Sequence, residues 1–372
     1  MTKPDDLLPD GLEDKLPREA EAITRAMRAS LDVLWSHGYD RVRPPLIEFE
    51  KSLAGRMASG HDGVQPRRMF RFVDPVSLRT LALRSDITPQ IGRIAATSMA
   101  NEHRPLRLAY CGETALIKAD QLAPARERIQ LGGELIGADT VAAASEIVSL
   151  AVEALAAAGL TGISIDFTLP DLVDTLAEKA LPLAPDQIDA VRRELDMKDA
   201  GGLKAAGGTA YLPLLYATGP LSDALEKLCA IDAGGALSSR IKGLEAIAEG
   251  IGKTARVTLD PTERHGFEYQ SWFGFTLYAD GIRGALGRGG TYKIGGSEEP
   301  ATGFTLYVDQ MIEARRQSDT SACVYLAKGH DAAKAAELRA EGYRTLAQIS
   351  DGEDPAALGC THQLIGGVLT VL

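Results

Sequence analysis

Residues 104–137 (RPLRLAYCGETALIKADQLAPARERIQLGGELIG) restrict the fold of this chain more than any other stretch. Apolar residues alternate with other residues on both sides of a loop, which is the pattern of a β-hairpin. In the second strand the alternation separates two faces: Ile129, Leu131, Gly133 and Leu135 on one, and Arg128, Gln130, Gly132 and Glu134 on the other. We therefore expect a long hairpin within an antiparallel sheet.

The polar face of this second strand has two interpretations. Gln130 and Glu134 are four residues apart, about 13 Å along a strand, so they are able to hold opposite ends of a small ligand. A carboxylate suits an ammonium group, and an amide both donates and accepts hydrogen bonds. Alternatively, both side chains simply face solvent on a half-buried sheet. The hairpin alone leaves both interpretations open.

The segment RSDITP, residues 84–89, is expected to end a strand and begin a helix. Thr88 would cap this helix, with Pro89 at its first position, and Asp86 would face its positive end. A strand end that leads into a helix is also a frequent place for small ligands. Asp86 and Thr88 therefore serve either the helix alone or a binding site.

Periodic segments elsewhere predict further helices and strands. Apolar residues at helical spacing predict helices over residues 17–38, 141–158 and 303–316. Alternating or apolar runs predict strands within residues 68–84, 162–169, 269–278 and 283–292. The stretch GYDRVRPPLIEFEKSL contains Pro44 and Pro45, which cannot donate to a β-ladder, so it belongs at a sheet edge or a subunit contact.

These elements predict an α+β fold on a largely antiparallel sheet with flanking helices. Residues 170–255 are rich in Ala and Leu and are expected to form a helical insertion. We expect a core over residues 1–318 that contains this insertion, and a small α/β tail over residues 319–372.

Composition argues against several functions. A net charge of -11 argues against nucleic-acid binding, which relies on clustered Lys and Arg. The cysteines are dispersed without a CxxC pair, which indicates reduced thiols rather than a disulfide framework or a metal site. Because the sequence shows neither a signal peptide nor a long apolar run, we expect a cytoplasmic protein that does not enter a membrane. The glycines near residues 284–290 match no nucleotide-binding motif, and no cofactor is expected.

From about residue 5 to 316 the chain resembles the catalytic core of histidyl-tRNA synthetase, a class II aminoacyl-tRNA synthetase. GYDRVRPPLIE resembles the first, dimer-forming motif of that family, and LALRSDIT resembles its LRPEGT segment. The hairpin of residues 104–137 resembles the second motif, GRGGTYK resembles GGRYD, and GFTLYVDQM resembles the third motif. This order of motifs implies a class II synthetase-like core.

Departures from the synthetase motifs concern the cations that bind ATP. The arginine of the second motif corresponds to Leu116 and its nearby glutamate to Lys118, while the arginine of the third motif corresponds to Gln310. The arginine of the histidine-specific RGLDYY segment corresponds to His265, although a shift of register would bring Arg264 there. Each lost charged contact to phosphate costs about 1.5–3 kcal/mol, so the resemblance does not imply adenylate formation.

The amino-acid side of the pocket is better retained. Six residues match histidine-contacting positions of the synthetases: Asp86, Thr88, Gln130, Glu134, Tyr269 and Tyr292. The second tyrosine of RGLDYY has become Gln270, which changes the imidazole side of the pocket. The resemblance therefore implies a histidine-binding site without catalytic residues.

A synthetase-like core without aminoacylation arginines resembles the regulatory subunits of ATP phosphoribosyltransferase. That resemblance implies a non-catalytic subunit of a glycosyltransferase complex, required for the first step of histidine biosynthesis. Its expected partners are a short-form catalytic subunit, L-histidine as the feedback effector, and a second copy that meets the N-terminal motif within a hetero-oligomer; no tRNA is expected. The alternatives are a divergent synthetase-like enzyme that forms an aminoacyl-adenylate, and an amino-acid-binding or scaffold protein of another pathway.

Overall fold

The computed structural model describes residues 7–57, 69–117, 125–231, 234–264, 270–295, 297–312 and 322–372. The chain divides into two compact units, Met1–Arg315 and Arg316–Leu372. The boundary expected at residues 318 and 319 lies outside the described residues.

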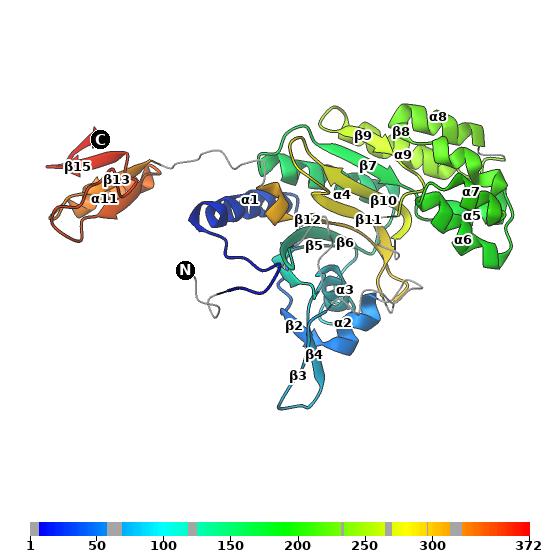
Figure 1. Ribbon diagram of the computed structural model, residues 1–372, viewed down its shortest axis with the longest axis horizontal. Coiled ribbons are helices and arrows are strands. Elements are labelled where there is room, and N and C mark those ends of the chain that lie inside the picture. Colours follow the sequence, from blue (N-terminus) through cyan, green and yellow to red (C-terminus); the bar gives the residue numbers. More distant parts are fainter. Residues whose placement is uncertain are drawn as a thin grey trace. The chain divides into compact units, whose positions relative to one another are not determined.

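The first unit is built on a 9-stranded sheet of the described residues, in the order β1-β5-β6-β12-β11-β10-β7-β9-β8 (Figure 1). Its strands are β1 (Asp40–Arg41), β5 (Leu106–Ala115), β6 (Glu127–Ile136), β7 (Ser164–Thr168), β8 (Gly219–Pro220), β9 (Arg256–Leu259), β10 (Gln270–Tyr278), β11 (Gly287–Lys293) and β12 (Pro300–Tyr307). In the sheet order, every neighbouring pair from β5 through β6, β12, β11 and β10 to β7 is antiparallel. By contrast, β1 lies parallel to β5, and β9 lies parallel to β7. The expected hairpin and antiparallel sheet are confirmed.

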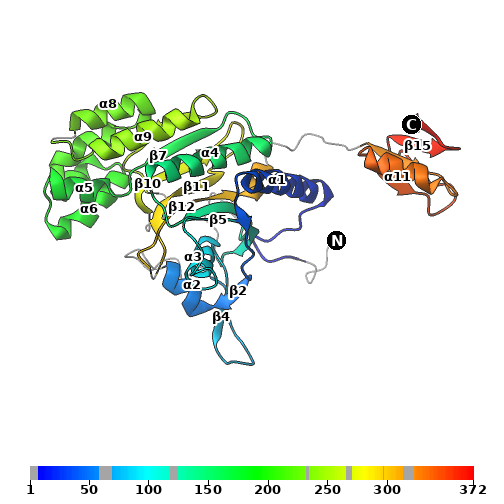
Figure 2. The same cartoon turned by 180° about the vertical axis from the view of Figure 1, so that it is seen from behind.

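One face of this sheet is covered by α1 (Pro17–Ser36) and α4 (Val141–Ala157), which lie side by side (Figures 1 and 2). The Ser30 hydroxyl of α1 donates to the Ala154 carbonyl oxygen of α4 at 3.1 Å, which joins the two helices. Ile147 of α4 packs in the same buried cluster as Leu131 and Leu135 of β6. This layer is the larger part of the hydrophobic core.

The opposite face of the β5–β6 hairpin is covered by α3 (Thr88–Ala96). Ile87, Ile91 and Ala95 pack there against apolar side chains of β5 and β6. Both faces of the hairpin are therefore buried, and Gln130 and Glu134 are only 7% and 1% exposed. The interpretation that these two side chains face solvent is wrong.

The segment between β7 and β9 is mainly helical and forms the green end of the molecule in Figure 1. Its elements are α5 (Leu172–Lys179), α6 (Pro185–Asp196), α7 (Ala200–Ala205), the 3-10 helix η3 (Thr209–Tyr216), α8 (Leu221–Ile231) and α9 (Ser238–Ile251). Asp199 caps α7 by accepting from the backbone N–H groups of Gly201 and Gly202. The segment adds helices at the end of the sheet remote from β1.

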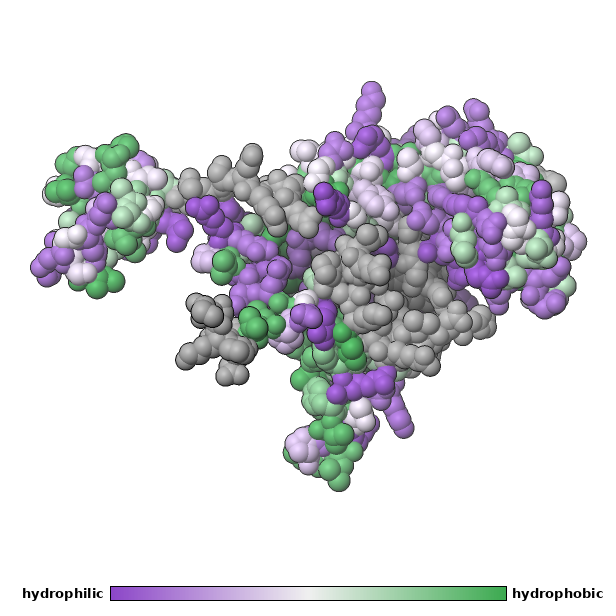
Figure 3. Space-filling model, viewed as in Figure 1, coloured by the Kyte–Doolittle hydropathy of each residue, from purple (hydrophilic) through white to green (hydrophobic). Residues whose placement is uncertain are grey.

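A second, 3-stranded sheet in the order β2-β4-β3 leads into α3. It contains β2 (Ile47–Phe49), β3 (Arg71–Val73) and β4 (Thr80–Leu83), and α2 (Glu50–Met57) follows β2. The β3–β4 hairpin lies at the bottom of Figure 3, where hydrophobic (green) surface gathers. Its exposed apolar side chains are Phe72, Val73, Val76 and Leu78. We refer to residues 72–78 as the exposed hairpin.

The C-terminal unit has its own small sheet in the order β14-β13-β15-β16. Its elements are β13 (Cys323–Leu326), α11 (Ala332–Ala340), β14 (Arg344–Ala347), β15 (His362–Ile365) and β16 (Val368–Val371). Asp331 caps α11 by accepting from the Ala333 N–H at 2.8 Å. Val324, Leu338 and Leu364 belong to the buried cluster of this unit.

Two local expectations are wrong. The helix expected over residues 303–316 begins only at α10 (Val308–Met311), because Gly303–Leu306 pair on both sides as part of β12. The apolar spacing that predicted this helix comes from a strand that continues directly into a short helix. Thr88 is not an N-cap: α3 begins at Thr88, the cap position is Ile87, and no side chain caps it.

The layer beneath α4 gives a stability prediction. Ile147 is 0% exposed, so replacing Ile147 by Ala leaves a cavity and is expected to lower the free energy of unfolding by about 2–5 kcal/mol. Met197→Ala, at a site that is 66% exposed, should change it by less than about 0.5 kcal/mol. Denaturant titration followed by tryptophan fluorescence reports on the first unit, which contains Trp35 and Trp272. Equal losses in the two variants would contradict this packing.

Candidate functional site

The centre of the candidate site is the carboxyl group of Glu134, which β6 directs toward α3. The Thr88 hydroxyl at the start of α3 donates to Glu134 Oε1 at 3.1 Å. The Tyr292 hydroxyl of β11 donates to Glu134 Oε2 at 2.8 Å. The Tyr110 hydroxyl of β5 lies 3.5 Å from Oε1 and pairs more closely with Thr305 Oγ1 at 2.6 Å. Hydroxyl groups from separate elements therefore converge on one buried carboxyl.

Two glycines provide the space for this cluster. Gly303 of β12 lies opposite Glu134 in the register, and a Cβ atom at Gly303 would lie 1.6 Å from Glu134 Oε2. Gly132 lies opposite Tyr110, and a Cβ atom there would lie 2.5 Å from the tyrosine oxygen. A side chain at either glycine would displace a polar group of the site, so both positions require the smallest residue.

Gln130 holds the segment that enters α3. Its Oε1 atom accepts a hydrogen bond from the Ile87 N–H at 3.0 Å, and its side chain also hydrogen-bonds the Asp86 carboxylate. The Thr88 N–H donates to Asp86 Oδ1 at 3.3 Å. The amide thus donates and accepts as expected, but its partners belong to its own chain. Gln130 therefore positions Asp86 and Thr88 next to Glu134.

The electrostatics of the cluster favour a protonated carboxyl at Glu134. Burial raises the pKa of Glu134 to about 8, and the nearby negative charge of Asp86 contributes to the rise. The hydroxyl groups of Tyr292, Thr88 and Tyr110 act against it by donating to the carboxylate. Burial also raises the pKa of Asp86, opposed by the hydrogen bonds from its neighbours. Glu134 and Asp86 are therefore two buried acids whose ionised forms a nearby positive charge would stabilise.

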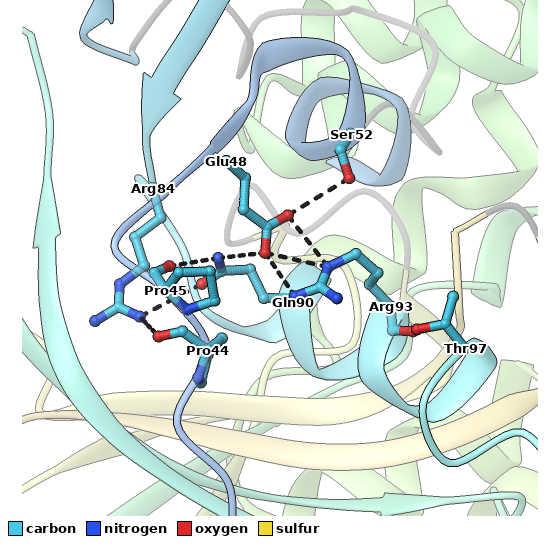
Figure 4. Close-up of polar contacts among 8 residues, drawn as sticks. All are labelled: Pro44, Pro45, Glu48, Ser52, Arg84, Gln90, Arg93 and Thr97. Atoms are coloured by element: carbon cyan, nitrogen blue, oxygen red, sulfur yellow. Dashed lines mark hydrogen bonds and ion pairs between the residues drawn. The ribbon is translucent and has the colours of Figure 1, made fainter.

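A hydrogen-bond network anchors α3 behind the site (Figure 4). The Arg93 guanidinium binds the Glu48 carboxylate of β2 at 2.6 Å. The Gln90 amide donates to Pro45 O at 2.8 Å and to Glu48 Oε1 at 2.9 Å. Arg84 is 4% exposed and donates to Gln90 Oε1 at 3.4 Å. The network connects the position of Thr88 to the proline-containing segment before β2.

Two arginines lie on the same face of the sheet as Glu134. Residues opposite each other on paired strands share a face; Tyr307 lies opposite Gln130, and Arg288 lies opposite Thr305. The Arg128 guanidinium lies 5.7 Å from the centre of the Tyr307 ring. Burial raises the pKa of Tyr307, and Arg288 and Arg128 act against the rise. The face therefore combines buried acids at one end with cations toward the other.

The structure brings together five of the six residues expected to bind histidine: Asp86, Thr88, Gln130, Glu134 and Tyr292. Tyr269 lies outside the described residues, as do Lys118 and His265. Of the positions that correspond to synthetase arginines, Leu116 pairs its backbone N–H with Arg126 O at 2.8 Å. At a second such position, Gln310, the buried Oε1 atom has no hydrogen-bond partner among the described residues.

Sequence reasoning missed the roles of Tyr110, Thr305 and Arg288. The sequence signal was Gly132, a glycine between two polar residues on one strand face. Its missing side chain leaves room for the Tyr110 ring of the neighbouring strand. The contact of Tyr110 with Thr305 could not be found, because Thr305 was expected to lie in a helix.

The part of the chain that the structure describes contains neither a metal-binding cluster nor a membrane-spanning helix. No group of three or more His, Cys, Asp or Glu side chains there is arranged to hold a metal ion. None of the helices there combines the length and apolar character needed to span a bilayer.

The antiparallel sheet, its covering helices and the buried acidic cluster define a histidyl-tRNA synthetase-like protein. Residues 11–311 match the family of histidyl-tRNA synthetases. A solved structure described as an ATP phosphoribosyltransferase regulatory subunit/histidyl-tRNA synthetase, from Bacillus halodurans, superimposes with a TM-score of 0.80. It is 24% identical and covers 96% of this chain and 97% of that one, so it supports the fold alone.

Two curated relatives identify the family more closely. A protein of Rhodospirillum centenum named ATP phosphoribosyltransferase regulatory subunit is 41% identical over 97% of this chain and 95% of its own length. A protein of the same name from Paramagnetospirillum magneticum is 39% identical over 96% of each chain. The chain belongs to the family of ATP phosphoribosyltransferase regulatory subunits.

The buried carboxyl of Glu134 gives a pH prediction. Its pKa is about 8 in the folded chain, compared with an ordinary value of 4.5. Because the folded state holds the proton more tightly, this stabilisation is complete below about pH 4.5 and is lost as the pH rises through 8. Relative to Glu134→Gln, the unfolding free energy of the wild type should fall by on the order of 1 kcal/mol per pH unit between about pH 5 and 8.

Denaturant titrations of both proteins at several pH values measure this difference. Glu249→Gln, which changes an exposed residue of α9, should keep the wild-type pH dependence. A constant difference between the wild type and Glu134→Gln across this range would show that Glu134 is charged in the folded chain.

Proposed function

We propose that this chain is the non-catalytic regulatory subunit of an ATP phosphoribosyltransferase and takes part in feedback regulation by L-histidine. The observation that carries the proposal is the similarity to regulatory-subunit relatives along 97% and 96% of the chain. The substitutions at Leu116 and Gln310 support it, since each removes a cation that a synthetase uses to bind ATP. In this role the chain supplies no catalytic residue and requires no cofactor or metal.

Histidine is proposed to bind at Asp86, Thr88, Gln130, Glu134, Tyr269 and Tyr292. The ammonium group of the amino acid suits the Glu134 carboxyl, because both oxygens of this group already lie among hydroxyl groups rather than cations. Its carboxylate suits Arg288, which shares the same face of the sheet. Binding at neutral pH would require Glu134 to lose its proton, so histidine binding should release a proton.

The catalytic partner is proposed to be a short-form ATP phosphoribosyltransferase, with the regulatory chain forming a homodimer through its N-terminal motif. Leu46 and Ile47 of that motif are 43% and 41% exposed. The exposed hairpin lies in the same 3-stranded sheet as Ile47. Exposed apolar side chains gathered on one small sheet are typical of protein interfaces. The net charge of -11 supports the absence of tRNA from the assembly.

An adenylate-forming enzyme is the second candidate. The observation in its favour is the pair Arg128 and Arg288, because guanidinium groups on the face of the site are also suited to phosphate. Neither residue lies at a position where the synthetase motifs carry their phosphate-binding arginines. An assay of ATP–pyrophosphate exchange separates the candidates, since only the enzyme would show histidine-dependent exchange.

Association with a catalytic subunit is the first test. The purified chain mixed with a short-form ATP phosphoribosyltransferase is expected to form a hetero-oligomer, visible by light scattering after gel filtration, and to raise the phosphoribosyltransferase rate. The chain alone should run at twice the mass of one copy and show no ATP–pyrophosphate exchange. The regulatory proposal would be overturned if the chain neither forms a complex with short-form catalytic subunits from several related organisms nor changes their rate.

Histidine binding is the second test. Calorimetry in buffers with different ionisation enthalpies should show histidine binding with the release of up to one proton at pH 7, because Glu134 has a pKa of about 8. The affinity should rise with pH up to about 8. Glu134→Gln is expected to lose about 1.5–3 kcal/mol of binding free energy, the usual value of a hydrogen bond to a charged group.

Glu249→Gln is the matched control and should bind histidine like the wild type. Glu134→Gln should still associate with the catalytic subunit, which would show that the variant is folded. Unchanged histidine affinity in Glu134→Gln would remove Glu134 from the binding site while leaving the association proposal intact.

A further inference from the structure

Two cysteines that are distant in the sequence lie in contact in the C-terminal unit. The Sγ atoms of Cys323 and Cys360 are 3.4 Å apart, although 37 residues separate them. Cys323 begins β13, and Cys360 lies just before β15, the parallel neighbour of β13. Both are free thiols.

The backbone around the pair is fixed by the ends of the two strands. The Thr361 N–H donates to Cys323 O at 2.8 Å, and the Cys323 N–H donates to Thr361 Oγ1 at 3.1 Å. The sulfur atoms of the two cysteines are already 3.4 Å apart, and a disulfide bond measures about 2.03–2.05 Å. A bond between the two sulfur atoms therefore needs side-chain rotation and only a small movement of the strands.

The two thiols differ in their surroundings. Cys323 is partly exposed, whereas Cys360 is 6% exposed. Burial raises the pKa of the Cys360 thiol to about 11, and its contact with Cys323 adds to the rise. A reagent from solution therefore meets Cys323 first, and Cys360 is the thiol placed to react with whatever forms there.

We propose that Cys323 and Cys360 form a redox-active pair that closes to an intramolecular disulfide by exchange with a small-molecule disulfide such as oxidised glutathione. In the first step, Cys323 Sγ loses its proton and bonds to one glutathione sulfur, and the other glutathione leaves as a thiol. In the second step, Cys360 Sγ loses its proton, bonds to Cys323 Sγ and releases the second glutathione as a thiol. The two cysteines are oxidised by two electrons, and the glutathione disulfide is reduced to two thiols.

The remaining cysteines serve as internal controls. Cys229 in α8 is exposed and should form only a mixed disulfide with glutathione, since it has no cysteine contact among the described residues. Cys111 in β5 is partly buried, and burial raises the pKa of its thiol to about 11. Cys111 should therefore react more slowly than Cys229.

The test uses the full chain equilibrated with glutathione buffers of increasing oxidised fraction, then acid-quenched, alkylated and digested. In the wild type, mass spectrometry should find the peptide that contains Cys323 joined by a disulfide to the peptide that contains Cys360. The joined mass should be about 2 Da below the sum of the two thiol peptides. This link should appear before Cys229 is fully glutathionylated. The proposal would be overturned if Cys323 and Cys360 are both still alkylated as free thiols at an oxidised-glutathione fraction that fully modifies Cys229. A stable glutathione adduct on wild-type Cys323 would overturn it as well.

The variant Cys360→Ser separates an exchange pair from two cysteines that are merely close. It should trap glutathione on Cys323 as a lasting mixed disulfide, whereas Cys323→Ser should leave Cys360 unmodified. Glutathionylation of Cys360 in Cys323→Ser, at the rate seen for Cys229, would contradict the assigned order. Because the wild-type mapping needs no variant, misfolding of either serine variant would not affect the main test.

Discussion

The structure of the first unit depends on burying one carboxyl group between a helix and the sheet. An isolated buried charge is very costly, so the group either finds donors or holds its proton. Glu134 does both, with hydroxyl groups of Thr88 and Tyr292 at its oxygens and a pKa raised to about 8. α3 packs on this face of the hairpin through Ile91 and Ala95, and Thr88 at its first residue donates to the carboxyl. Gly303 is equally necessary, since any side chain there would occupy the position of Glu134.

Local patterns predicted the elements well, but not which faces they bury. The alternation in residues 104–137 assigned Gln130 and Glu134 correctly to one strand face. It could not show that α3 covers this face, because that contact joins segments far apart in the sequence. Thr88 and Pro89 matched the capping pattern, yet the hydroxyl binds Glu134 instead of the helix backbone. In Gly303–Leu306, pairing with β6 and β11 outweighed an apolar spacing that favoured a helix.

The fold does not decide between catalysis and regulation, because synthetases and regulatory subunits share it. The distribution of charge in the site is more informative. The acidic residues that suit an ammonium group lie together at the start of α3. Leu116 lacks the charge that its motif position would need to hold a triphosphate, and its backbone N–H and C=O groups both hydrogen-bond Arg126. Arg128 and Arg288 supply positive charge on the face, but on the sheet rather than at those motif positions.

The proton on Glu134 also sets the scale of the proposed regulation. Ionising a carboxyl with a pKa of about 8 at pH 7 costs about 1.4 kcal/mol, which lies within the 1–3 kcal/mol that typically couples two sites. An ammonium group offsets this cost through a charge-assisted hydrogen bond, whereas a neutral ligand does not. Ionisation would also strengthen the bond from Thr88, and α3 is joined to β2 through Gln90 and Arg93. A change of charge at Glu134 thus acts on the helix that connects the site to the proposed subunit contact.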